Sequence, residues 1–230
     1  MIEKGAGFVI AATGLRTEAR IAARSGGVRA VVGGDGATRR LDRLLRQSIV
    51  EGGEAIISFG IAAGLAPECS AGACLIGREV VYSGISYSAD PGWITGIKET
   101  IGGAHLVTIA GVDRPLARSS EKRSLHQATG AAAADMESHV VAGLAAEVGL
   151  PFAVLRVIAD PAEREVPLAA LAGMRPDGGI EIGAVLVSLA RSPRQLPALV
   201  RLAADAGHAL VALLRCSDLL GPRLGFRDLG

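Results

Sequence analysis

The sequence is poor in cysteine, in aromatic residues and in net charge, and each shortage excludes a class of protein. Its three cysteines cannot form an even disulfide framework, and no histidine accompanies Cys69 and Cys74 at the spacing of zinc ligands. Aromatic residues make up 3% of the chain and the net charge is +1, which argues against a nucleic-acid partner. No uninterrupted apolar run reaches the roughly 20 residues of a membrane span. These shortages favour free thiols in a reducing cytoplasm and no metal site.

Apolar residues, in contrast, make up 50% of the chain and alternate between strand and helix patterns. Apolar runs predict strands at 8–12, 28–32, 55–59, 73–81, 104–110 and 152–158. Helical spacing predicts helices at 15–24, 37–50, 140–148 and 179–190. We further expect a loop and a helix within 111–131, and a loop with a short helix within 161–177. This alternation is typical of an α/β domain, and 230 residues fit within one such domain.

The chain ends in a predicted amphipathic helix that begins near residue 196. Its apolar residues stand at 196, 199, 200, 203, 207, 210, 211 and 214, and charged residues stand on the opposite face. We expect this helix to pack on the body or across a homodimer, with a membrane surface as the alternative. We therefore divide the chain into a main domain at 1–192 and a helical extension of the same domain at 193–230.

The segment 135–160, DMESHVVAGLAAEVGLPFAVLRVIAD, places carboxylates at the ends of one helix and one strand. Ligands bind at the carboxyl ends of strands in open α/β sheets, so Glu137 and Asp160 are expected to face one cleft. Taken singly, Glu137 is an ordinary acid in the first turn of a helix, and Asp160 caps the turn before Pro161.

These DME and RVIAD motifs resemble the signature of the nucleoside phosphorylase and nucleosidase superfamily, and SFGIAAGLAP at 58–67 resembles its glycine-rich motif. The resemblance covers about 8–190. It implies a three-layer α/β/α fold with a mixed, partly closed central sheet, and an enzyme that cleaves the N-glycosidic bond of purine nucleosides. It implies no metal or organic cofactor, and phosphate is a cosubstrate in the phosphorolytic members. Ala63 replaces the family's third glycine, and Ala159 replaces the serine before the acid.

The resemblance implies a role for each of three catalytic acids. Asp160 is the general acid that protonates the departing purine near N7, which requires a pKa raised by burial. Glu137 accepts hydrogen bonds from the ribose hydroxyls and adds negative charge beside the developing sugar cation. Glu18 matches the position that activates water in the hydrolytic members, although an isolated acid between two arginines is also typical of a solvated helix face.

The same resemblance implies the substrate-binding residues. Met136 packs against the sugar, and Ser58 and Gly60 contact the substrate. Gly14 and Arg16 offer free backbone N–H groups and a cation that could hold phosphate. The choice between water and phosphate as nucleophile stays open at this stage.

Three of the seven aromatic residues, Tyr82, Tyr87 and Trp93, fall in one window, YSGISYSADPGW. They either line the pocket for the 5′ substituent or anchor a surface loop. Asp113 or the backbone near Gly111 is the candidate contact for the purine. The histidines at 105, 126 and 139 share no ligand spacing and are interpreted as ordinary surface or core residues.

Within the superfamily, ADMESHVVAGLA, GVDRP and the apolar extension most resemble the hopanoid-associated phosphorylases. That likeness implies adenine release from adenosylhopane. A nucleosidase for methylthioadenosine and adenosylhomocysteine is the alternative, and a non-catalytic nucleoside-binding protein is the second. The expected partners are an adenosyl nucleoside, free or lipid-linked, and a second copy of the chain. The expected location is cytoplasmic, with surface contact to a membrane as an option.

Overall fold

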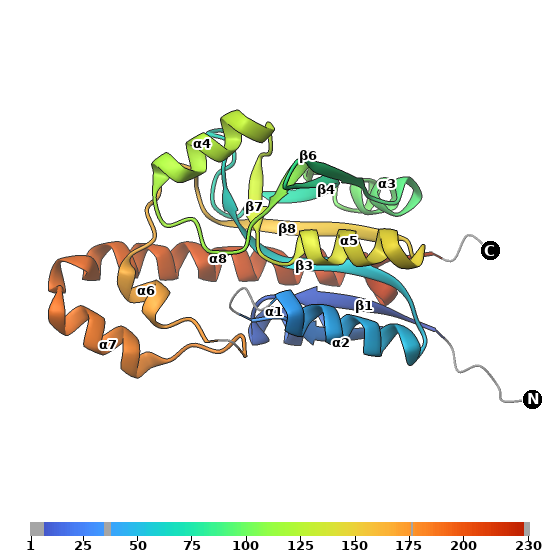
Figure 1. Ribbon diagram of the computed structural model, residues 1–230, viewed down its shortest axis with the longest axis horizontal. Helices are drawn as coiled ribbons and strands as arrows, with labels where there is room; N and C mark the ends of the chain where they lie inside the picture. The colour runs from blue at the N-terminus through green and yellow to red at the C-terminus, as the bar shows by residue number, and fades with distance from the viewer. Residues whose placement is uncertain (1–6, 35–37, 176, 228–230) are drawn as a thin grey trace, which may run out of the picture.

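The computed structural model describes residues 7–34, 38–175 and 177–227. Within these ranges, eight strands form one sheet: β1 (Phe8–Thr13), β2 (Val28–Val32), β3 (Gly53–Gly64), β4 (Cys74–Tyr82), β5 (Ile85–Ser88), β6 (His105–Gly111), β7 (Ala133–Asp135) and β8 (Phe152–Asp160). The α-helices are α1 (Arg16–Ala22), α2 (Thr38–Val50), α3 (Pro91–Thr100), α4 (Ser119–Thr129), α5 (Ser138–Val148), α6 (Leu168–Ala172), α7 (Ile182–Arg191) and α8 (Leu196–Leu220) (Figure 1).

The sheet is mixed and partly closed, as the family resemblance implies. Its main path runs β2-β1-β3-β7-β6-β4-β5, and β8 pairs with both β3 and β4. Strands β3, β7, β6, β4 and β8 therefore form a closed ring. Strand β3 is parallel to β1 and β8 but antiparallel to β7, and β4 is antiparallel to β5 and β8.

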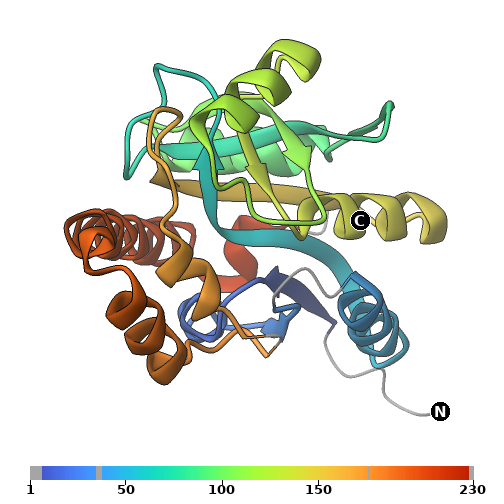
Figure 2. The ribbon, with the colours of Figure 1, turned by 60° about the vertical axis from the view of Figure 1, so that its left-hand side comes forward.

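Two apolar cores lie on the two faces of this sheet. Alternate side chains of β1 point to opposite faces, so Ile10 joins one core and Val9 joins the other. Helices α2 and α5 cover the first core, and α1, α3 and α8 cover the second. The result is the predicted three-layer α/β/α arrangement (Figure 2).

The predicted strands and long helices are all present, and three elements come in addition: β5, α3 and β7. The segment 85–100 forms β5 and α3 because Asp90 accepts a hydrogen bond from the backbone N–H of Trp93 at 2.7 Å and Pro91 stands at the first helical position. Strand β3 continues past residue 59 through the glycine-rich motif as far as Gly64. Ala37, predicted as the start of α2, lies outside the described residues.

Helix α8 packs on the sheet through a face that differs from the predicted one. The side chains that join the core are Ala209, Leu213, Cys216 and Leu220, whereas Leu196, Val200 and Val211 are at least half exposed. Apolar residues occur nearly all around this helix, so periodicity alone does not select the buried side.

The N-terminal half of α8 and the whole of α7 project beyond the sheet (Figure 1). We call residues 180–201 the apolar arm. Its exposed apolar side chains are Ile180, Ile182, Leu186, Val187, Leu196 and Val200, each more than half exposed.

Candidate active site

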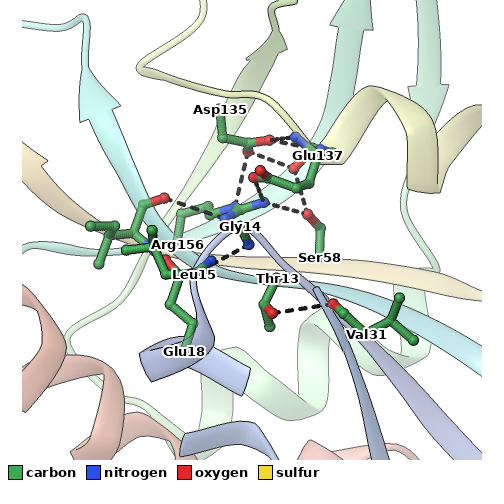
Figure 3. Close-up of polar contacts among 11 residues, drawn as sticks. Thr13, Gly14, Leu15, Glu18, Val31, Ser58, Asp135, Glu137 and Arg156 are labelled. Atoms are coloured by element: carbon green, nitrogen blue, oxygen red, sulfur yellow. Dashed lines mark hydrogen bonds and ion pairs between the residues drawn. The ribbon is translucent and has the colours of Figure 1, made fainter. Parts of the chain in front are cut away.

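Arg156, in the middle of strand β8, is the centre of the polar site (Figure 3). Its side chain is fully buried, and its guanidinium lies 3.0 Å from Asp135 Oδ2 and 3.2 Å from Glu137 Oε2. It also donates to Ser58 Oγ at 2.6 Å and to the carbonyl of Ile61 at 3.3 Å. Removing a guanidinium from water costs roughly several kcal/mol, and a buried guanidinium needs such partners to offset that cost. Arg156 therefore organises the carboxylates around it.

Asp135 holds the start of helix α5. Its Oδ1 accepts from the backbone N–H groups of Glu137 at 2.9 Å and Ser138 at 2.7 Å, and its Oδ2 accepts from the Ser138 hydroxyl at 2.6 Å. These bonds satisfy N–H groups that the helix itself leaves unpaired. Because Asp135 also pairs with Arg156, it fixes the side chain of Glu137 beside the guanidinium.

Glu18 reaches the same site from helix α1 and is 1% exposed. Its Oε2 accepts from the backbone N–H groups of Gly14 and Leu15 at 2.9 and 2.8 Å, and its Oε1 accepts from the N–H of Ile61 at 2.8 Å. The solvated-face interpretation of Glu18 is therefore wrong. The N–H groups of Gly14 and Leu15, expected to be free for phosphate, are also already bonded.

Two glycines allow this close packing. A Cβ on Gly14 would lie 2.7 Å from Glu137 Oε1. A Cβ on Gly60 would lie 2.6 Å from Glu18 Oε1 and 2.7 Å from Arg156 Nη1. Gly14 and Gly60 thus let backbone approach the charged groups at distances that no side chain would permit.

Burial and an excess of carboxylates set the protonation of the site. Three carboxyl groups, those of Glu18, Asp135 and Glu137, share the single guanidinium of Arg156. Burial raises the pKa of Glu137 to about 8, assisted by the neighbouring Asp135 and Glu18 carboxylates and opposed by Arg156. Burial also raises the pKa of Glu18, again against the effect of Arg156. Glu137 therefore holds a proton in much of the protein at neutral pH.

Asp160 is the last residue of strand β8, the strand that also carries Arg156. Ala63 of β3 is paired with Asp160 of β8 and with Ala134 of β7, and Gly60 is paired with Arg156. The register shifts between Ala62 and Ala63, which leaves Ala159 as a bulge directly before the acid. Three residues of strand span about 10 Å. The β3 partners of Arg156 and Asp160, Gly60 and Ala63, are therefore about 10 Å apart along the strand.

The environment of Asp160 differs from that of the other acids. Its side chain is 13% exposed, and Oδ2 lies 2.6 Å from the ammonium of Lys122, which is fully buried. Burial raises the pKa of Asp160, and the Lys122 ammonium opposes that rise. Asp160 is thus a carboxyl group whose proton affinity depends on two opposing influences.

The remaining predicted binding residues have the following positions. Met136 is partly exposed between Asp135 and Glu137. Ser58 is fully buried and its hydroxyl bonds to Arg156 and, at 3.0 Å, to the Ser138 hydroxyl. Arg16 is 57% exposed and pairs with Asp177 at 2.8 Å. The guanidinium expected to hold phosphate thus already has a carboxylate partner.

The aromatic window does not form one pocket. Trp93 is 3% exposed in the second core and donates from Nε1 to the carbonyl of Leu224 at 3.0 Å. Tyr87 packs against the first core. Tyr82 borders a cavity of about 470 Å³, where its hydroxyl donates to Asp113 at 2.9 Å and its ring stacks on His139, whereas Trp93 lines a separate cavity of about 890 Å³. The interpretation of all three as one lining is therefore wrong.

Four residues of the site carry no role in the sequence interpretation: Asp135, Ser138, Arg156 and Lys122. Arg156 could have been found, because an arginine inside an apolar strand must have buried acidic partners. Lys122 stands in a polar helix, SSEKRSLHQAT, where nothing in the pattern distinguishes it from exposed neighbours.

Comparison with known proteins agrees with this architecture. Residues 3–190 match the phosphorylase superfamily profile. The 5′-methylthioadenosine/S-adenosylhomocysteine nucleosidase of Helicobacter pylori superposes with a TM-score of 0.65 at 15% identity, covering 94% of this chain and 99% of that one. Futalosine hydrolase of Helicobacter pylori gives 0.62 at 17% identity, covering 80% and 97%.

The S-adenosylhomocysteine nucleosidase of Streptococcus pyogenes gives a TM-score of 0.60 at 17% identity, covering 70% of this chain and 86% of that one. No curated protein matches the sequence. The family match covers most of the chain, including Glu18, Glu137 and Asp160. The chain therefore belongs to the phosphorylase superfamily and is a nucleoside phosphorylase or nucleosidase.

Proposed function

We propose that this enzyme hydrolyses the N-glycosidic bond of an adenosyl nucleoside and releases adenine. The observation that carries the proposal is the placement of Glu18, Glu137 and Asp160 around strand β3. Two of these carboxyl groups lie beside Arg156, and the third belongs to Asp160, whose partner on β3 is about 10 Å along the backbone from the partner of Arg156. That spacing suits a ribose at one end and a purine at the other.

Each carboxyl group then has one task. Asp160 donates its proton to N7 of the purine while the electron pair of the C1′–N9 bond moves onto the base. Glu137 binds the ribose hydroxyls and, once ionised, stabilises the positive charge on the sugar. Glu18 accepts a proton from the attacking water as its oxygen bonds to C1′. The raised pKa values of Glu18 and Asp160 suit a base and an acid that work near neutrality.

Water is favoured over phosphate as the nucleophile by the bonds already made around Gly14. Glu18 accepts the N–H groups of Gly14 and Leu15, and Asp177 pairs with Arg16. A phosphate at this loop would have to displace two carboxylates and would then lie beside the buried negative charges of the site.

The apolar arm supports a substrate with a lipid-like 5′ substituent, and adenosylhopane is the substrate we propose. The arm begins next to the active site, because the carbonyl of Gly178 accepts from the N–H of Arg16 at 3.1 Å. Gly178 also packs against the Gly14 carbonyl. Ile180 and Ile182, about 70% exposed, follow directly. An apolar surface thus starts within a few residues of Gly178, which contacts the loop whose N–H groups bind the Glu18 carboxylate.

The arm also has the charge pattern of a helix pair that lies on an anionic membrane. Residues 178–204 contain Arg191, Arg194 and Arg201, all exposed, and one acid, Glu181. Residues 193–220 are long and apolar enough to cross a membrane, by length and composition alone. The C-terminal half of α8 is packed on the sheet, so we propose surface contact through the arm.

Adenine release from adenosylhopane, 5′-methylthioadenosine and adenosine, each with and without phosphate, tests these proposals. We expect phosphate-independent release, fastest from adenosylhopane. Release that requires phosphate would overturn the hydrolytic mechanism. Equal or better turnover of methylthioadenosine would instead favour the nucleosidase alternative, for which the same three acids serve. No release from any substrate would favour a nucleoside-binding protein.

A double variant, Ile182→Ser with Val187→Ser, tests the arm separately. We expect KM to rise for adenosylhopane and to stay unchanged for methylthioadenosine, and co-sedimentation with vesicles that contain anionic lipid to fall. A change in oligomeric state, measured by light scattering, would show instead that a second copy of the chain covers the arm. Val50→Ser, at an exposed apolar position outside the arm, is the matched control.

A further inference from the structure

Lys122 of helix α4 is fully buried, and its ammonium has an unusually complete set of acceptors. Nζ lies 2.6 Å from Asp160 Oδ2 and also donates to the carbonyls of Asp160 at 3.2 Å, Pro161 at 2.9 Å and Arg164 at 2.9 Å. Every oxygen atom in this shell is an acceptor, which matches the N–H donors at the end of a lysine side chain. Among the described residues, the carboxyl group of Asp160 is the only side chain in the shell.

The pair has a definite orientation. Lys122 donates to Oδ2 of Asp160, which sets the orientation of the carboxyl group. The three carbonyls come from Asp160 itself and from the loop that follows β8, so the ammonium also fixes that loop against α4. Asp160 is therefore held at both its backbone and one carboxylate oxygen by a single cation.

Other charged groups have a smaller effect on the Asp160 carboxylate than Lys122 does. Asp205 of α8 repels the Asp160 carboxylate, and Arg164 of the following loop pairs with Asp205 at 3.2 Å. Without Lys122, burial and Asp205 would both favour the neutral carboxyl group. Lys122 is the described cation in contact with the Asp160 carboxylate, and it favours the ionised form, as does a backbone hydrogen bond of Asp160 itself.

We propose that Lys122 is a positioning residue that makes Asp160 an effective proton donor. This inference rests on the proposed function. Asp160 gives its proton to purine N7, the C1′–N9 electron pair moves onto the base, and the carboxylate that remains is stabilised by the Lys122 side chain at Oδ2. Lys122 transfers no proton in this step. Asp160 is therefore a stronger acid than burial alone would make it, and the bond from Lys122 to Oδ2 fixes the orientation of its carboxyl group.

The test is the pH dependence of kcat/KM for adenine release by Lys122→Met, with methylthioadenosine or whichever nucleoside the wild type turns over best. Loss of an opposite charge in contact with a carboxyl group raises its pKa by about 1–3 units. We expect the limb at which activity falls with rising pH to move upward by that amount, with kcat reduced by about tenfold or more. Arg123→Met removes an exposed cation from the next position of α4 and should leave the limb in place.

A purely structural role for Lys122 would lower kcat without moving the limb, and that result would overturn the inference. If Lys122→Met does not fold, Lys122→Gln replaces it, because the amide can still donate to the carbonyls but carries no charge. In an Asp160→Asn background, removal of Lys122 should cause little further loss, since it acts through Asp160. An inactive wild type would refute the proposed function itself, whereas an active wild type with an unmoved limb refutes only the role of Lys122.

Discussion

Replacement of Glu137 by glutamine should make the protein less sensitive to alkaline pH, although it removes half of an ion pair. The pKa of Glu137 is about 8 in the folded protein against an ordinary value of 4.5. The folded state therefore holds this proton more tightly than the unfolded state does. The resulting stabilisation is complete below about pH 4.5 and is lost as the pH rises through about 8.

The size of the effect follows from the shift. One pKa unit corresponds to about 1.4 kcal/mol, so the full contribution is about 5 kcal/mol, and about 3 kcal/mol of it is lost between about pH 5.5 and pH 8.5. Glutamine is uncharged in both states, so Glu137→Gln should lack this loss. Glu18 and Asp160 also have raised pKa values, but these residues are present in both the wild type and Glu137→Gln, so the comparison isolates Glu137.

Guanidinium chloride unfolding of wild type and Glu137→Gln at the two pH values measures the difference. With a slope of about 5 kcal/mol per molar denaturant, the wild-type midpoint should fall by about 0.6 M more than that of the variant. Parallel pH dependence in the two proteins would refute the assignment of a neutral, buried Glu137. Glu147→Gln, at an exposed carboxylate of the same helix, serves as the control.

Three further substitutions test separate parts of the structure. Gly60→Ala should lower the free energy of unfolding by about 2 kcal/mol or more in chemical denaturation, because its Cβ would lie 2.6 Å from a carboxylate oxygen. Gly96→Ala, inside helix α3 with no tertiary neighbour within 4 Å of the new Cβ, should instead raise it by up to about 1 kcal/mol. Asp160→Asn should reduce kcat for adenine release by about 100-fold or more while nucleoside binding, measured by calorimetry, persists; unchanged turnover would exclude the general-acid role. Trp93→Phe should cost about 1 kcal/mol in thermal unfolding, because the bond from Nε1 to the Leu224 carbonyl is lost, and an unchanged melting temperature would contradict that contribution.

The fold was predictable because most of its elements carry strong local patterns. Strands such as β1 and β8 are continuous apolar runs, and helix α5 ends where Gly149 and Pro151 predict. Strand β7, in contrast, has three residues and exists only because it lies between β3 and β6. No local pattern encodes such an element.

The candidate site was predictable in three of its acids, but not in Asp135 or in its cations. Glu18, Glu137 and Asp160 stand in recognisable motifs, so the sequence leads directly to them. The partners of Arg156 lie between 19 and about 100 positions away in the sequence. Lys122 stands in a helix with no distinctive pattern, and its carboxylate partner lies in a different strand. Their importance comes from burial, and burial of single polar residues is a property of the tertiary structure.

The closed ring of β3, β7, β6, β4 and β8 determines how a substrate can enter. Each of these strands is hydrogen-bonded on two sides, so separating any one of them breaks two ladders. Amide hydrogens in the ring should consequently exchange with solvent only through large unfolding events, and the acids anchored to it keep a fixed spacing. Motions that admit a substrate are then expected in segments outside the ring, among them the loop before α4 and the loop that leads from Asp160 to the apolar arm.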